Sequence, residues 1–146
     1  MITENTGKRR IELFEILNNI ELAKTKDKRV EGIRHFSKQY PSFNDYLRCL
    51  LDDRITFNLP EGRPPFTPAH EAHHPTTWHK QHMRLKYFVK GGPEMTSVKR
   101  ESMWISLLEG IHPEDAVLIA DVSDKRGAPD WLTKEIVEEA VPNLIS

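Results

Sequence analysis

Apolar residues recur at every third or fourth position along most of this chain, which is the spacing of amphipathic helices. In the first such segment, Ile11, Phe14, Leu17 and Ile20 follow one another at intervals of three. This pattern predicts a helix over residues 8–23. Similar spacing predicts six further helices, which start at or directly after Thr25, Ser42, Thr77, Thr96 or Ser97, His112 and Thr133.

Residue types that favour helix ends accompany several of these segments. Ser42 and Asp45 fit a capping box, in which each side chain accepts from a backbone amide near the helix start. The stretch 112–115 reads His-Pro-Glu-Asp, which places proline in a first turn and two carboxylates at the positive helix end. Gly91 and Gly92 provide a left-handed stop after residue 90. Trp104 lies on the apolar face of the fifth predicted helix.

The segment 55–75 breaks the helical pattern because its proline density forbids a regular helix. The prolines are Pro60, Pro64, Pro65, Pro68 and Pro75. So long a segment is expected to be functional or to lie across the domain. Its first residues, Ile55-Thr56-Phe57, are the only candidate strand. The expected fold is all-α: a single helical domain over residues 1–146, a compact bundle of about six to seven short helices with a proline-rich arm at 55–75.

Composition predicts an ordinary soluble protein, with 38% hydrophobic and 29% charged residues. Cys49 is the only cysteine, which excludes an internal disulfide and favours a reducing compartment. Its apolar surroundings in the sequence predict a core position. No apolar run approaches the roughly 20 residues that span a bilayer. The stretch Met1 to Arg10 lacks the apolar centre of a secretory signal. We therefore expect a cytoplasmic protein with no membrane partner.

Charge is unevenly distributed along the chain, although the net charge is only −1. Residues 55–100 hold 7 basic and 3 acidic residues, whereas residues 101–146 hold 3 basic and 10 acidic residues. The last third therefore carries −7. Such asymmetry is typical of proteins with two faces for different partners, and it also arises from solvated acidic helix ends.

Residues 70–74 read His-Glu-Ala-His-His, which matches the H-E-x-x-H signature of zinc proteases. In that signature His70 and His74 would bind the metal from one helical face, and Glu71 would activate water. Pro68 and Pro75 bracket the stretch and leave barely one turn, so we expect no rigid helix and no metal site here. A metal-dependent hydrolase that uses the His70–His74 cluster is the third functional hypothesis.

A run of basic residues follows the histidines, and no acidic residue occurs between positions 72 and 93. Six basic residues lie on the helix after Thr77 or at the start of the next one, with Trp78 and Tyr87 among them: Lys80, Arg84, Lys86, Lys90, Lys99 and Arg100. A basic stripe with aromatic neighbours is typical of phosphate binding. A solvated helix face would give the same pattern. Other templates, such as a phosphate-binding glycine loop or a nucleophile elbow, are absent, so we expect no catalytic residues and no cofactor.

Two stretches carry a resemblance to a known family. The first is Arg9-Arg10-Ile11-Glu12-Leu13-Phe14-Glu15-Ile16-Leu17-Asn18-Asn19-Ile20, and the second is Glu135-Ile136-Val137-Glu138-Glu139-Ala140-Val141-Pro142-Asn143-Leu144-Ile145. Together they resemble the all-helical N-terminal DNA-binding domain of the DNA ligase of T-even phages. The chain also resembles an uncharacterised family of short proteins from T4-like phages of marine cyanobacteria, most clearly in the stretch 107–116.

The resemblance implies a mode of binding and no catalysis, because the catalytic core of the ligase is missing. It implies backbone contacts to duplex DNA from Arg54 and Arg63 near the arm and from Lys99 and Arg100, and a location in the cytoplasm of the infected host cell. The first hypothesis is therefore a non-enzymatic phage accessory protein that binds duplex DNA without reading its sequence. The second is a regulatory factor that binds a host or phage replication or transcription protein through the acidic last third.

Overall fold

Helices account for the regular structure of the chain, as the apolar spacing predicts. The computed structural model describes residues 10–145, and within this range it contains seven α-helices, one 3₁₀ helix and no strand. The all-α prediction is therefore confirmed. The elements are α1 (Leu13–Glu21), α2 (Lys26–Gln39), α3 (Pro41–Leu51), α4 (Trp78–Gln81), η1 (His82–Tyr87), α5 (Ser97–Gly110), α6 (Pro113–Val122) and α7 (Lys134–Ala140).

Side-chain caps set most helix starts. The hydroxyls of Thr25, Thr96 and Thr133 each accept a hydrogen bond from the backbone N–H three residues later. Helix α1 begins at Leu13, because Glu12 and Glu15 form a capping box there. The predicted start at residue 8 lies outside the described residues.

The predicted capping box at Ser42 is wrong. Helix α3 begins one residue earlier, with Pro41 in its first turn and Tyr40 in extended conformation before it. Ser42 consequently lies inside the helix, where its hydroxyl is hydrogen-bonded to Nδ1 of His79 at 2.5 Å. The fixed φ of proline suits the first helical position and outweighs the serine cap.

The helix predicted between Thr77 and residue 90 is shorter and changes type. Helix α4 ends after one turn and continues as η1, in which side chains repeat every three residues. Beyond η1 the chain is extended: Val89 forms a bridge with Phe57, and the N–H of Lys90 donates to the carbonyl of Thr56 at 2.8 Å. The candidate strand at 55–57 is therefore this isolated bridge.

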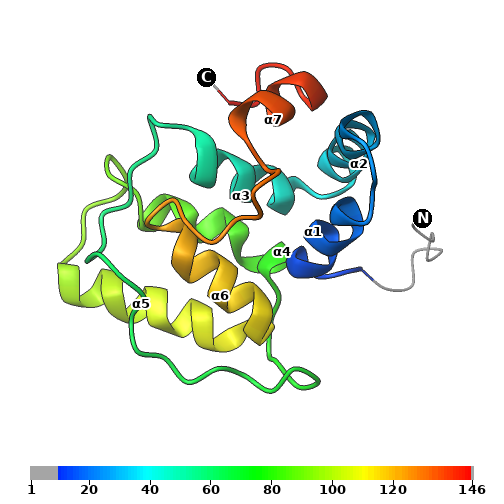
Figure 1. Cartoon of the computed structure of the whole chain (residues 1–146). Coiled ribbons are helices and arrows are strands. Elements are labelled where there is room, and N and C mark those ends of the chain that lie inside the picture. The colour runs from blue at the N-terminus through cyan, green and yellow to red at the C-terminus, as the bar shows by residue number, and fades with distance from the viewer. Residues whose placement is uncertain (1–9, 146) are drawn as a thin grey trace.

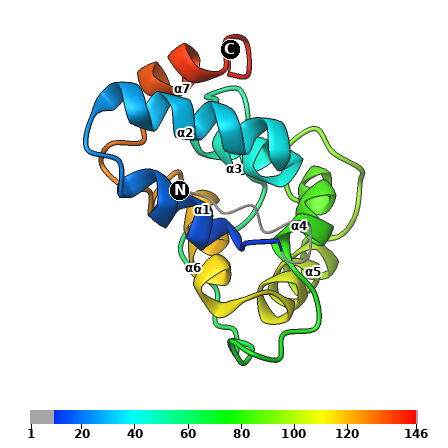
Figure 2. The ribbon, with the colours of Figure 1, turned by 90° about the vertical axis from the view of Figure 1, so that its right-hand side faces the viewer.

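The buried side chains form one cluster to which every α-helix contributes. Helix α2 packs against α1, α3 and α7, while α6 packs against α1, α3 and α5 (Figure 1). Helix α3 also contacts α4 and η1, and Figure 2 shows α3 above both α6 and α4. Cys49 is buried in this core as predicted, and burial raises the pKa of its thiol to about 12.

The proline-rich arm lies across α5 and α6 (Figure 1). The backbone N–H of Gly62 donates to Asp124 at 3.0 Å, and the N–H of Thr67 donates to Glu109 at 2.8 Å. Farther along, the N–H of Thr76 donates to the carbonyl of Gly110 at 2.9 Å. A proline-rich segment cannot pair its backbone groups in a regular helix or sheet. These hydrogen bonds satisfy some of those groups and hold the arm against the domain.

We predict that Trp104→Ala lowers the free energy of unfolding by about 3–5 kcal/mol, because it removes a large buried aromatic side chain. Trp104 is 3% exposed and packs against Phe57 and Phe88, with ring centroids 5.8 and 4.9 Å away. Urea denaturation measures the change, with Val98→Ala as the control, since Val98 is 77% exposed on the same helix. A loss below about 1 kcal/mol for Trp104→Ala would place this side chain outside the core.

Candidate nucleic-acid interface

Six basic side chains lie on consecutive elements, and together we call them the basic surface: Lys80 on α4, Arg84 and Lys86 on η1, Lys90 after η1, and Lys99 and Arg100 in the first turns of α5. Five of them are exposed, and Arg100 is half-buried. None of the six forms an ion pair with another described residue within 10–145, and the guanidinium of Arg100 donates to the carbonyl of Met95 at 3.0 Å. Their charge is therefore available to a ligand.

The change of helix type alters how these residues are grouped. Lys86 and Lys90 were expected one turn apart on a single helix, but Lys90 lies beyond η1 in the extended bridge. The α4–η1 segment and the loop 88–96 together lead into α5 (Figure 1). The basic surface is thus formed by a helical segment, a loop and a helix start rather than by one helical stripe.

The start of α5 concentrates positive potential. Helix N-termini carry a partial positive charge and normally have acidic residues in the first turn. Helix α5 has none there, and instead Lys99 and Arg100 add two cations. This arrangement costs some helix stability and favours an anion beside the free backbone amides.

Two hollows border α5, one at its start and one farther along the helix. One, of about 580 Å³, lies between the 89–96 loop and Arg100. The other, of about 390 Å³, lies between α4–η1 and α5 and includes Arg84, Ser102 and Ser106. Arg84 and Arg100 therefore line neighbouring hollows next to the same helix. Glu94 lines the first hollow and is its only carboxylate.

Of the four residues that the family resemblance implied, Arg54 and Arg63 do not belong to the basic surface and form ion pairs. Arg54 pairs with Asp52 through two bonds of 3.2 and 3.1 Å, and Arg63 pairs with Asp121 through bonds of 3.1 and 2.9 Å. Both pairs use the guanidinium in its two-pronged geometry, which neutralises it locally. The structure therefore separates Arg54 and Arg63 from the unpaired cations of the basic surface.

The histidine-rich stretch forms tertiary contacts rather than a helix. His70 and His73 face each other across a tight turn, so the one-face geometry of H-E-x-x-H is not formed, as the flanking prolines predict. His79 links Ser42 to the carbonyl of Ile11 at 2.6 Å, and Nδ1 of His82 lies 2.6 Å from Asp45. Burial lowers the pKa of His79. Within residues 10–145 no three His, Cys, Asp or Glu side chains are grouped to hold a metal ion.

Several acidic residues of the last third are paired or buried. Asp121 pairs with Arg63, Asp124 pairs with Arg126, and Glu139 pairs with Lys26. Asp115 is fully buried. Asp115, Asp121, Asp124 and Glu139 therefore contribute to contacts within the fold.

Asp115 performs a role that sequence analysis missed. It lies in the first turn of α6, and its carboxylate accepts from the backbone N–H of Leu13 at 3.1 Å and of Phe14 at 2.7 Å. It thus also caps α1, about a hundred residues earlier in the chain. Next to it His112 caps α6, and its ring stacks on Phe14 with centroids 4.5 Å apart. The motif at 112–115 indicated only the local helix start.

The fold and this surface define a small all-helical protein with exposed basic residues between α4 and the start of α5. The sequence model of DUF6433, a family of unknown function, matches residues 16–127, so the chain belongs to this family. No curated protein matches the chain, and no solved structure matches it. Among the helices in residues 10–145, none is long and apolar enough to cross a membrane.

We predict that the Asp115→Asn variant loses a pH dependence of stability that the natural protein has. Burial raises the pKa of Asp115 to about 7, although the amides of α1 oppose this. The folded protein then binds the proton more tightly than the unfolded chain, whose aspartate pKa is about 3.9. The contribution of Asp115 to the free energy of unfolding is therefore fully present below about pH 4. It falls by at most about 1.4 kcal/mol per pH unit up to about pH 7.

Urea denaturation of both proteins at several pH values isolates this contribution, because all other titrating groups are common to them. The natural protein should lose more stability than the variant between about pH 4 and pH 7. Parallel stability curves would mean that the buried carboxylate is ionised throughout this range.

Proposed function

We propose that this protein is a non-enzymatic phage accessory protein that binds duplex DNA through the sugar–phosphate backbone and does not read base sequence. The observation that carries the proposal is the basic surface, with six cations between residues 80 and 100 and no ion pair from them to another described residue. Phosphate contacts of Lys and Arg supply most of the affinity of non-specific DNA binding.

The placement of cations at the start of α5 supports phosphate as the ligand. A helix start favours anions, and two basic side chains in the same turns increase that preference while adding nothing to helix stability. Phosphate contacts made by side chains and helix N-termini position a protein on duplex DNA and carry no sequence information.

The elements around the basic surface also suit an extended anion. Met83 is 70% exposed on η1 and Val98 is 77% exposed on α5, so apolar side chains accompany the cations. Such residues can contact sugars in a DNA groove while neighbouring cations bind phosphates. The resemblance to a ligase DNA-binding domain agrees with this proposal and remains a prediction.

We predict that affinity for duplex DNA falls steeply with salt, with a log–log slope of about −4 to −5, because four to six phosphate contacts each release condensed counterions. Replacement of Lys99 and Arg100 together by alanine should flatten this slope by about two units and weaken unrelated sequences equally. Fluorescence anisotropy with two labelled duplexes of different sequence measures both quantities.

A matched control is the double variant Lys24→Ala with Lys28→Ala, which removes the same amount of positive charge. Both residues are exposed; Lys24 lies just before α2 and Lys28 lies in its first turn. Its slope should equal that of the natural protein. Absence of duplex binding at about 50 mM salt, or equal losses in both double variants, would contradict the proposal, because the attraction would then be absent or would follow net charge alone.

A further inference from the structure

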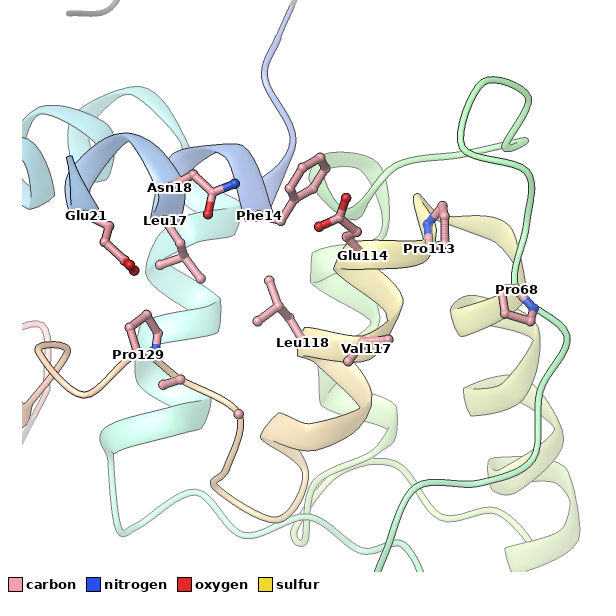
Figure 3. Close-up of a pocket in the computed structure, with 12 residues that line it drawn as sticks. Phe14, Leu17, Asn18, Glu21, Pro68, Pro113, Glu114, Val117, Leu118 and Pro129 are labelled. Atoms are coloured by element: carbon pink, nitrogen blue, oxygen red, sulfur yellow. The ribbon is translucent and has the colours of Figure 1, made fainter.

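An open apolar groove of about 670 Å³ lies between α1 and α6 (Figure 3), and no residue of the basic surface lines it. Leu17 from α1 and Leu118 from α6 project toward the space between the two helices, and Phe14 closes the side near the start of α1. Val117 on α6 is 39% exposed although its side chain is apolar. Phe14 and Leu118 are half-buried and Leu17 is buried. Apolar side chains that remain partly exposed in a concave site indicate a binding surface.

The remaining wall is the turn after α6, and its conformation requires glycine. Gly127 has a φ of 87°, and a Cβ at this residue would lie 2.8 Å from Cβ of Asp121. The tight turn brings the following residues back so that Pro129 faces the groove (Figure 3). The conformation of Gly127 therefore sets the course of this wall of the groove.

The charge around the groove has one sign. Glu21 and Glu114 lie at either side of the apolar centre and both residues are exposed (Figure 3). No Lys, Arg or His is among the residues that line the groove. An occupant with apolar side chains flanked by cations would complement it, whereas an acidic occupant or a nucleic acid would be repelled.

We propose that this groove binds a short amphipathic segment of a partner protein, with bulky apolar side chains on one face and Lys or Arg residues at its ends. The channel between two packed helices can accept the apolar face of a third helix, which is a recurrent mode of peptide recognition. The apolar side chains would pack on Leu118 and Val117, and the flanking cations would pair with Glu21 and Glu114. This binding goes beyond the proposed DNA contact and uses none of its residues.

The position of the groove permits both contacts at once. None of the residues that line the groove belongs to the basic surface. A partner held at α1 and α6 would therefore be carried to DNA without competing for the cations of the basic surface.

The test is a selection from a random peptide library displayed on phage, using the immobilised full chain, with counter-selection against the variant Val117→Lys. We expect enriched sequences with apolar residues at helical spacing and Lys or Arg near both ends. Calorimetry of synthesised selected peptides should show affinity at least about tenfold weaker for Val117→Lys, which places a charge in the apolar centre. Glu21→Gln with Glu114→Gln should weaken binding less and reduce its salt dependence.

Val98→Lys is the matched control, because it makes the same change at an exposed valine on α5, away from the groove, and should leave peptide affinity unchanged. Thermal melts of every variant show whether the fold is intact, and Glu21→Gln with Glu114→Gln tests the same site without altering the apolar wall. No enrichment over the counter-selection, enrichment of acidic peptides, or equal affinity for Val117→Lys would overturn the proposal. A natural protein that sediments as a dimer, and becomes monomeric in Val117→Lys, would also overturn it, because the occupant would be a second copy of this chain.

Discussion

The carboxylate of Asp115 joins the starts of α1 and α6 inside the protein, and the relative position of these two helices depends on it. Its two oxygens accept hydrogen bonds from the backbone amides of Leu13 and Phe14. These amides lie in the first turn of α1, where no carbonyl of the helix can accept from them. The side chain is fully buried, so loss of this contact would leave unpaired amides in the core. Because α1 and α6 also form the walls of the apolar groove, the same bond that stabilises the core fixes the geometry of that surface.

Some charged side chains of this protein form contacts within the fold, whereas others are available to bind a partner. Glu109, Asp121 and Asp124 hold the arm or the turn after α6, and Glu139 pairs α7 with α2. Lys125 donates to the carbonyls of Cys49 and Asp52 at the end of α3. Among the described residues the cations of the basic surface form no ion pair, although Arg100 donates to the carbonyl of Met95. Although the net charge is near zero, the basic surface can attract phosphate, and the apolar groove is flanked by carboxylates.

Local patterns predicted the helices because each one has apolar periodicity and a recognisable start, as Thr25, Thr96 and Thr133 illustrate. They failed where two local signals competed, as at Pro41 and Ser42, and where helix type depended on a distant strand-like contact at Phe57. The basic residues of the candidate interface were found from sequence alone. Three features could not be predicted, because each depends on segments far away in the chain. They are the cap from Asp115 to α1, the contacts of His79 and the exposure of Val117.

The central claim is that the segment from α4 to the start of α5 contacts DNA phosphates. The most direct measurement is a titration of ¹⁵N-labelled protein with a short duplex at low salt, followed by amide chemical shifts in NMR spectra. We expect the changes to concentrate at residues 80–90 and 96–100, with α2, α7 and the groove helices α1 and α6 little affected. Changes centred on α2 and α7, or the absence of changes at any salt concentration, would contradict this account.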